Sequence, residues 1–252
     1  MRRSSTLTRR FSKTLRPILL LLALMLAAPV PAALALTVAS GAGYKRLVDE
    51  VAAAFTAATG RKVELVYGNM GQIIAQAKAG GVVDLIAGDR RRFEESTLDI
   101  AGYTDIGRGR LVVAFAKDVT LAAPKDVANA GIKRLAMPDP KKAIYGRACA
   151  EFLNKAGLAD TVKDKLLVVG TVPQVTAYLV SREVDAGCVN LTDAMGAVKD
   201  LGGYLPVDES LYSPIVITVG QIKGATDTDG IKAFLEFLAT PEVADIVKRH
   251  GL

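Results

Sequence analysis

The sequence predicts an α/β protein of two lobes, and three features of the chain after residue 35 support this prediction. Short apolar segments alternate with small-residue turns and with segments whose apolar residues recur at helical spacing. Two further apolar segments, at 110–117 and 215–219, stand where a chain would leave one lobe and later return to it. Residues 36–252 are enough for one large domain or two modest ones. Such alternation is typical of parallel strands covered by helices on both faces.

The first 35 residues have the pattern of a secretory signal. A stretch with six Lys and Arg residues precedes an apolar run at 18–28 and a small-residue exit at Ala33-Leu34-Ala35. We therefore expect cleavage near Ala35, a mature chain that begins at Leu36, and a periplasmic location.

Two other fates of this segment stay open. A retained membrane anchor is disfavoured because the apolar run is short and is followed by Pro29 and Pro31. Export by the twin-arginine route is suggested by Arg9 and Arg10, although the residues around this pair fit that signal poorly.

Removal of the signal changes the charge of the protein. The signal carries six of the 32 Lys and Arg residues and none of the 26 Asp and Glu residues, so the mature chain has no net charge. The basic isoelectric point of the precursor is therefore no sign of a surface for nucleic acid or membranes. Trp is absent and aromatic residues make up 6% of the chain, which disfavours a carbohydrate site built on ring stacking.

The first lobe is expected at 36–114 and 216–252. Its N-terminal half alternates strands and helices: a strand at 36–39, a turn at 40–43, a helix at 44–58 that ends at Gly60, a strand at 62–67, a turn at 68–71, a helix that ends at 80–81, and a strand at 83–87. Arg90, Arg91 and Arg92 follow beside acidic residues, so a solvated helix face is favoured over a binding patch.

The second lobe is expected at 115–215. It contains strands at 134–136, 166–169 and 185–189, and the chain returns to the first lobe near Pro214, ahead of final helices at 229–238 and 241–250. Hinges near Val113 and Ile217 would close the lobes over a cleft at the carboxyl ends of the strands, where open α/β sheets bind ligands.

Cys149 and Cys188 are the only cysteines of the chain. Export makes a disulfide between them possible. Two buried free thiols remain the alternative, because a sequence does not define the separation of the two Cα atoms.

Residues for catalysis are missing from the pattern. His250 is the sole histidine and lies at the end of the last helix, where an exposed position is expected, so Ser-His-Asp catalysis and histidine-based metal sites are disfavoured. The glycine turns lack the Lys-Ser/Thr of a phosphate-binding loop, and no close pair of carboxylates suggests acid and base chemistry. An exported phosphate-ester hydrolase that uses Ser40 or Tyr145 would lack a base and metal ligands. We therefore do not expect an enzyme.

Four expected helices begin directly after a strand and a turn of small or polar residues. Their starts are at Ala42-Gly43, at 69–71, at Tyr145-Gly146 and at Val172-Pro173. A helix start exposes unpaired backbone N–H groups and partial positive charge, which suits an anion. Any one such turn can also be a tight connection only, so the prediction of an anion site depends on their coincidence.

Several stretches match a known pattern: the turns at 39–42 and 68–71, Asp-Leu-Ile-Ala-Gly-Asp at 84–89, Asp-Pro and Tyr-Gly-Arg-Ala within 139–148, Asp-Ala-Gly-Cys-Val-Asn at 185–190, and the closing segment at 240–244. In these stretches the chain resembles the periplasmic molybdate-binding proteins of ABC transporters, and the likeness extends from Leu36 to Leu252. The segments at 84–89 and 139–148 are the most specific.

The resemblance implies a type II periplasmic-binding fold, in which two lobes joined by two crossing strands hold a dianionic oxyanion by backbone N–H groups and hydroxyls. Carried over by position, the contacts fall on Ala42, Met70, Tyr145, Val172 and Asn190, with Gly43 and Asn69 beside them. Ala42 and Met70 stand where relatives have Ser, and Asn190 stands where many have Tyr. Tyr44, Tyr145 or Asn69 would have to supply replacement donors.

The resemblance also implies a function. It predicts an extracytoplasmic, monomeric binding protein that captures molybdate or tungstate and delivers it to an ABC transporter permease, with no cofactor, no metal held as a cation and no nucleic-acid partner. The alternative within this class is a binding protein for another oxyanion or a small organic acid. A sensing domain of a regulator is disfavoured by the signal and by the lack of DNA-binding helices.

Overall fold

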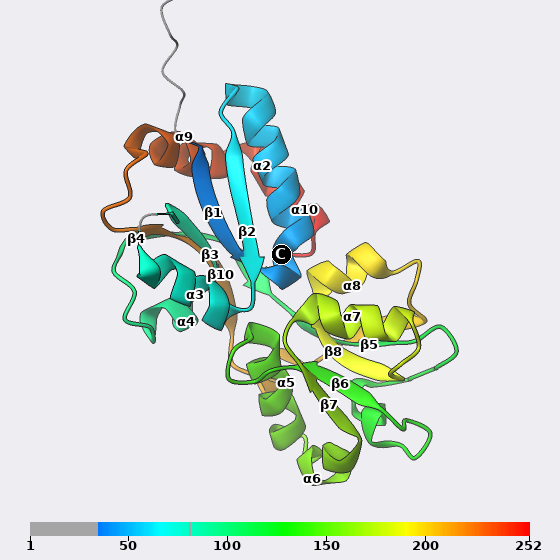
Figure 1. Cartoon of the computed structure of the whole chain (residues 1–252). Coiled ribbons are helices and arrows are strands. Elements are labelled where there is room, and N and C mark those ends of the chain that lie inside the picture. Colours follow the sequence, from blue (N-terminus) through cyan, green and yellow to red (C-terminus); the bar gives the residue numbers. More distant parts are fainter. Residues whose placement is uncertain (1–34, 81) are drawn as a thin grey trace, which may run out of the picture. The chain divides into compact units, whose positions relative to one another are not determined.

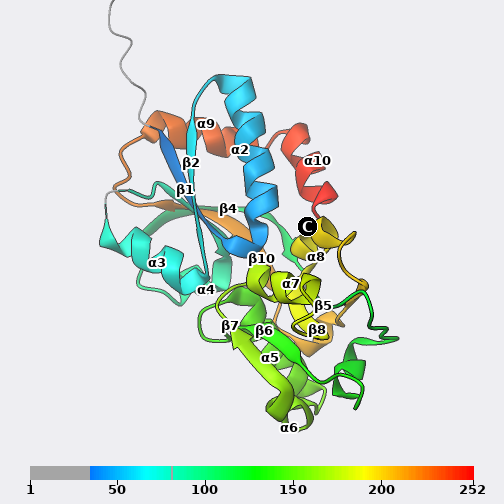
Figure 2. The same ribbon diagram turned by 45° about the vertical axis from the view of Figure 1, so that its right-hand side comes forward.

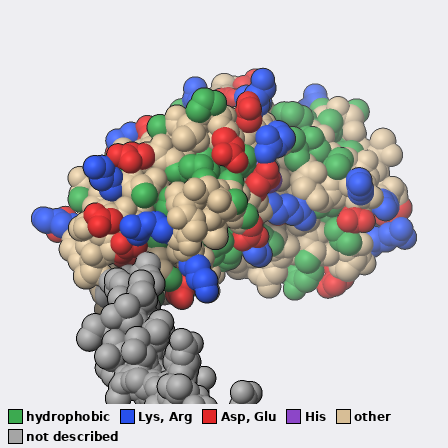
Figure 3. Space-filling view, turned by 90° about the horizontal axis from the view of Figure 1, so that it is seen from above, with side chains coloured by type: hydrophobic (Ala, Val, Ile, Leu, Met, Phe, Trp, Pro, Cys, Tyr) green, Lys and Arg blue, Asp and Glu red, His purple; other side chains and the backbone are tan. Residues whose placement is uncertain are grey.

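The computed structural model describes residues 35–80 and 82–252 of the chain, so the expected signal lies outside the described residues. Residues 35–252 contain two five-stranded sheets, each with its own helices (Figure 1). No helix of this described part is long and apolar enough to cross a membrane. On the face shown in Figure 3, Lys and Arg are interspersed with Asp and Glu, and no area of a single charge dominates.

The sheet of the first lobe has the strand order β2-β1-β3-β10-β4. Its strands are β1 (Leu36–Gly41), β2 (Val63–Gly68), β3 (Leu85–Asp89), β4 (Ile100–Gly109) and β10 (Ile215–Ile222). Its helices are the 3-10 turn η1 (Ala42–Tyr44), α2 (Lys45–Thr59), α3 (Met70–Ala79), α4 (Arg90–Glu94), α9 (Thr228–Leu238) and α10 (Pro241–Arg249).

Helix α2 illustrates why these segments fold as the spacing predicts. Leu47, Val51 and Phe55 recur at helical intervals and are all buried. The helix ends at Gly60, whose φ of 71° is favourable for glycine. The ring of Phe55 packs edge-on against Phe234 of α9, with centroids 5.1 Å apart. Figure 2 shows α10 beside α2, so the C-terminal helices complete the cover of this lobe.

The sheet of the second lobe has the strand order β7-β6-β8-β5-β9. Its strands are β5 (Leu111–Phe115), β6 (Leu135–Pro138), β7 (Leu166–Val169), β8 (Ala186–Asn190) and β9 (Gly203–Pro206). Its helical segments are η2 (Pro124–Ala128), α5 (Ile144–Lys155), α6 (Ala159–Val162), η3 (Lys163–Lys165), α7 (Val172–Val180), α8 (Leu191–Ala197) and η4 (Glu209–Leu211). A disulfide joins Cys149 of α5 to Cys188 of β8, so of the two interpretations the bonded pair is confirmed.

Both sheets are mixed, whereas the strand and helix alternation predicts parallel strands. Strands β1, β2 and β3 are parallel, as are β6, β7 and β8. Strand β10 is antiparallel to β3, and β5 is antiparallel to β8. The reason is the route of the chain: β5 and β10 each enter a sheet directly from the other lobe, so they start at the seam where the parallel strands end.

The two crossings lie between sheets rather than within strands. Strand β4 ends at Gly109 and β5 begins at Leu111, so the first crossing falls at Arg110, a few residues before the expected boundary at 114. Val113 pairs with Cys188 in the second sheet, and Ile217 pairs with Asp89 in the first. Both expected hinge positions therefore lie within paired strands, and the chain crosses between the lobes at Arg110 and returns through 207–214.

Candidate anion-binding site

The carboxyl ends of the parallel strands place four helix starts around one hollow. Strands β1 and β2 end in register at Gly41 and Gly68, and the first turns η1 and α3 follow them. Strands β6 and β7 end in register at Pro138 and Val169, ahead of α5 and α7. The hollow is lined by Gly41, Ala42, Gly43, Tyr44, Gly68, Asn69, Met70, Ala143, Ile144, Tyr145, Thr171 and Val172.

This lining includes six of the seven residues that the sequence predicts for the site. Ala42, Gly43, Asn69, Met70, Tyr145 and Val172 come together, and Asn190 does not line the hollow. Gly41, Gly68, Ala143, Ile144 and Thr171 were missed, and Tyr44 was named only as a replacement donor. The sequence feature that could have identified them is their position just before or within an expected helix start.

The hollow is small and its lining is neutral. Its cavity volume is about 20 Å³, and a single water molecule needs roughly 10–15 Å³ on the same scale. None of the described residues that line it carries a charged side chain. Such a hollow suits a compact ligand and provides backbone dipoles in place of formal charges.

The cap of α3 leaves one N–H group of its first turn uncommitted. Asn69 accepts a hydrogen bond from the Gln72 N–H at 3.0 Å, and the Gln72 side chain accepts from the Asn69 N–H at 2.9 Å. The Gly71 N–H donates to the Lys142 carbonyl of the second lobe at 3.2 Å. Among the described residues, the Met70 N–H at the edge of the hollow has no acceptor.

Among the described residues, the start of α7 also leaves one N–H group of its first turn without an acceptor, for a different reason. The Thr171 hydroxyl caps the Gln174 N–H at 3.4 Å. Pro173 has no N–H group, and it occupies a position in the first turn where proline is tolerated. Within the described part of the chain, the Val172 N–H alone of this turn is left to face the hollow without an acceptor.

The starts of η1 and α5 have no side-chain cap. The N–H groups of Ala42 and Tyr145 have no acceptor among residues 35–80 and 82–252. Gly146 lets α5 start close to β6, because a Cβ atom there would lie 2.4 Å from the Pro138 carbonyl oxygen. Four separate segments that line one small space therefore each carry a backbone N–H group without an acceptor among the described residues.

Met70 contributes its backbone to the hollow and its side chain to the core. The side chain is 1% exposed and lies over Gly88, where a Cβ atom would approach the sulfur to 2.6 Å. The Met70 side chain therefore offers no donor to the hollow, and neither does the side chain of Ala42. In the first lobe, the donors of the hollow are backbone N–H groups.

Asn190 links the lobes at a position behind the hollow. Its side-chain amide donates to the Gly43 carbonyl at 2.9 Å, and its Oδ1 atom is buried without a partner among the described residues. A Cβ atom on Gly43 would lie 3.0 Å from that Oδ1 and 3.3 Å from Cβ of Val172. Asn190 therefore contacts the Gly43 turn instead of lining the hollow, and a side chain at Gly43 would require the second lobe to shift by a few tenths of an ångström.

Tyr44 and Tyr145 also join the lobes. Their buried hydroxyl groups hydrogen-bond to each other. Burial raises the pKa of both phenols well above the usual value, so both stay neutral. The hydroxyls lie beside the crossing: a Cβ atom on Gly109 would be 2.2 Å from the Tyr145 oxygen and 2.7 Å from the Tyr44 oxygen.

The remaining candidates have structural roles. The Ser40 hydroxyl is buried and donates to the Gly41 carbonyl at 3.4 Å. His250 was expected to be exposed, but its side chain is 17% exposed and its Nε2 atom lies 2.7 Å from Glu50. Arg90 and Arg91 pair with nearby acids on the surface, as a solvated face predicts, whereas Arg92 is 23% exposed and donates to the Lys141 carbonyl of the second lobe.

Comparison with known proteins identifies the family. Residues 36–252 match the family of bacterial extracellular solute-binding proteins. The chain belongs to this family. Members of such a family bind solutes and are not enzymes as a class, and the match agrees with the extracytoplasmic location expected from the sequence.

Relatives with established names cover nearly the whole chain. The molybdate-binding protein ModA of Rhodobacter capsulatus is 28% identical over 250 residues, which are 96% of this chain and 98% of that protein. The molybdate-binding protein ModA of Azotobacter vinelandii is 27% identical over 224 residues, with 85% and 88% of the two chains covered.

Solved structures show the same fold. The periplasmic molybdate-binding protein of Azotobacter vinelandii superimposes with a TM-score of 0.79 at 23% identity, over 86% of this chain and 97% of that one. The sulfate-binding protein SubI of Mycobacterium tuberculosis gives 0.72 at 17% identity, over 86% and 85%. The two-lobed α/β solute-binding fold expected from the sequence is confirmed.

Proposed function

We propose that this protein captures molybdate, or the closely similar tungstate, and delivers it to the permease of an ABC transporter. One observation carries the proposal: uncommitted N–H donors from four segments of both lobes converge on a small neutral hollow. Relatives named for molybdate binding match nearly the full length of the chain and support the choice of anion.

The electrostatics of the hollow favour a doubly charged guest. The starts of α3, α5 and α7 each carry about half an elementary positive charge, so together they offset much of two negative charges. We assign the contacts to the N–H groups of Ala42, Met70, Tyr145 and Val172, with Gly43 and Asn69 shaping the turns. Asn190 acts indirectly, through its bond to the Gly43 carbonyl.

Capture proceeds by closure of the lobes about the crossings. The anion first meets the donors of one lobe, and the second lobe then adds its own donors and excludes water. The protein acts in the periplasm as a monomer after cleavage near Ala35, holds no cofactor other than the transported anion, and is recognised by the permease in its closed form. It works by binding and not by catalysis, and turnover of a chromogenic phosphate ester would contradict this.

Isothermal titration calorimetry with molybdate, tungstate, sulfate and phosphate tests the ligand. We expect submicromolar binding of molybdate and tungstate, and its absence would contradict the proposal. Another compact oxyanion is the alternative, because four N–H donors serve any tetrahedral dianion. A small organic acid is the second alternative within this class.

A proline substitution tests the backbone donors directly. Val172→Pro removes one N–H at a position where proline fits, since Thr171 is extended with φ −144° and ψ 161°. Loss of a hydrogen bond to a charged group costs about 1.5–3 kcal/mol, which raises Kd by about 10- to 150-fold. Val172→Ala keeps the N–H and is the matched control, for which a much smaller change is expected. Equal effects of the two variants would contradict the backbone contact.

A further inference from the structure

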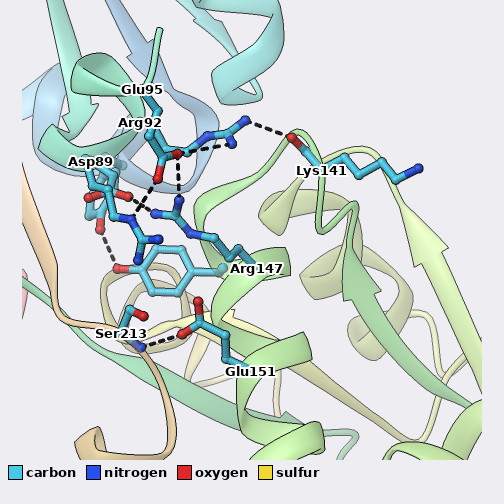
Figure 4. A network of polar contacts seen from close by, with 10 residues as sticks. Asp89, Arg92, Glu95, Lys141, Arg147, Glu151 and Ser213 are labelled. Atoms are coloured by element: carbon cyan, nitrogen blue, oxygen red, sulfur yellow. Dashed lines mark hydrogen bonds and ion pairs between the residues drawn. The ribbon is translucent and has the colours of Figure 1, made fainter.

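The two most specific segments of the sequence each contain a charged residue that the hollow does not use. Asp89 closes the segment at 84–89, and Arg147 lies in the Tyr-Gly-Arg-Ala segment. Asp89 is the last residue of β3 in the first lobe, and Arg147 is on the first turn of α5 in the second. Figure 4 shows the two side chains meeting across the seam between the lobes.

The contact is an ion pair that closure removes from water. The Arg147 guanidinium binds the Asp89 carboxylate through Nη2 and lies 3.2 Å from Glu95 through Nη1. The Asp89 side chain is 1% exposed and that of Arg147 is 18% exposed. Beside them, the Arg92 guanidinium donates to the Lys141 carbonyl of the second lobe at 2.7 Å.

Asp89 depends on Arg147 to remain charged in this position. Burial raises the pKa of Asp89, and the charge of Arg147 is the main opposing cause. The other carboxylate oxygen of Asp89 is buried without a partner within the described part of the chain. Arg147 is in turn neutralised by two carboxylates, so it is not free to serve as a cation for the anion.

We propose that Arg147 and Asp89 form a lock between the lobes, which makes Arg147 a positioning residue for the anion-binding state without contact to the anion. This inference rests on the proposed function. When the lobes separate, both groups are hydrated, and when the lobes meet, each group needs the other. The lock acts on the site through α5, because Arg147 lies two residues after Tyr145, whose N–H faces the hollow.

The physical reason for a strong effect is the asymmetry of buried ion pairs. Removal of one partner leaves the other charge buried and unpaired, whereas neutral replacement of both is tolerated much better. Arg147→Met leaves the Asp89 charge unpaired in the closed form and favours opening. Asp89→Asn leaves Arg147 with Glu95 as a partner, so its effect is expected to be smaller.

A double-mutant cycle on the mature protein, followed by molybdate calorimetry, tests the lock. Arg147→Met is expected to raise Kd on the order of 100-fold, and the double variant Asp89→Asn with Arg147→Met to return within about tenfold of the wild type. Arg147→Met should raise the Kd values for molybdate and tungstate by the same factor, since it acts on closure. Arg90→Met is the matched control, because Arg90 pairs with Glu94 and Asp105 on the surface of the first lobe and not with the carboxylates that bind Arg147.

The outcomes separate the lock from the function. If the double variant binds as weakly as Arg147→Met, Arg147 contacts the anion directly and the lock is refuted. The lock is also refuted if Arg147→Met binds like the wild type. A wild-type protein that binds none of the oxyanions overturns the proposed function itself, together with the coupling of the lock to an anion.

Discussion

Gly109 is the position at which a single added carbon atom should weaken binding without unfolding either lobe. It ends β4 at the crossing, and the hydroxyl groups of Tyr44 and Tyr145 meet beside it. A Cβ atom there would lie 2.2 Å from the Tyr145 oxygen, 2.7 Å from the Tyr44 oxygen and 2.9 Å from Cγ2 of Ile215. Because Tyr145 belongs to the second lobe, separation of the lobes relieves the worst of these overlaps.

The size of the effect follows from the cost of overpacking. Extra carbon atoms in a well-packed region cost about 1–3 kcal/mol. If the closed form alone carries this cost, Gly109→Ala raises the Kd for the anion by about 5- to 150-fold. The free energy of unfolding should change less than the binding free energy, because separation of the lobes removes the closest overlap, with Tyr145, and leaves the milder ones with Tyr44 and Ile215.

Calorimetry and thermal denaturation of three variants test this reasoning. Gly102→Ala is the control on the same strand, since a Cβ atom there meets nothing within 4 Å. Adding Tyr145→Phe to Gly109→Ala removes the closest atom and should restore part of the affinity. Unchanged affinity in Gly109→Ala would refute the argument, and so would a fall in melting temperature with no fall in affinity.

Three further predictions concern stability. Replacing Cys149 and Cys188 by Ala opens a link over 39 residues and should lower the free energy of unfolding by about 4 kcal/mol, measured by denaturant titration. Thr171→Ala removes the cap of Gln174 and should cost about 1 kcal/mol in the same assay, with Thr171→Ser as the control. Burial raises the folded pKa of Asp193, so its contribution to stability is present below its ordinary pKa of 3.8 and is lost as pH rises through the folded pKa. Asp193→Asn should therefore melt higher than the wild type at pH 7, and the difference should shrink as the pH falls toward 4.

The sequence predicted the helix starts because local chemistry determines them. Asn69 and Thr171 are cap residues, Pro173 suits a first turn, and apolar spacing defines α2 and α3. These signals act over a few residues, so they can be read without knowledge of the tertiary structure. They placed six of the lining residues correctly.

The position of the crossing and the role of Asn190 depend on contacts that local patterns do not encode. Arg110 alone separates β4 from β5, and nothing nearby in the sequence indicates that these strands belong to different sheets. The side chain of Asn190 binds Gly43, which is 147 residues away in the chain. The ion pair of Asp89 with Arg147 is equally remote, so the motifs that contain these residues indicated a family and not a contact.

The disulfide makes the rigidity of the second lobe depend on the compartment in which the protein matures. It bonds the helix that carries Tyr145 to the strand that ends at Asn190, and these two residues each form a hydrogen bond to the first lobe. The disulfide therefore fixes the spacing between the contacts that Tyr145 and Asn190 make with the first lobe. A chain retained in a reducing compartment would lack the disulfide, and its second lobe would hold the same donor groups less rigidly. Export would therefore complete the binding site in addition to delivering the protein.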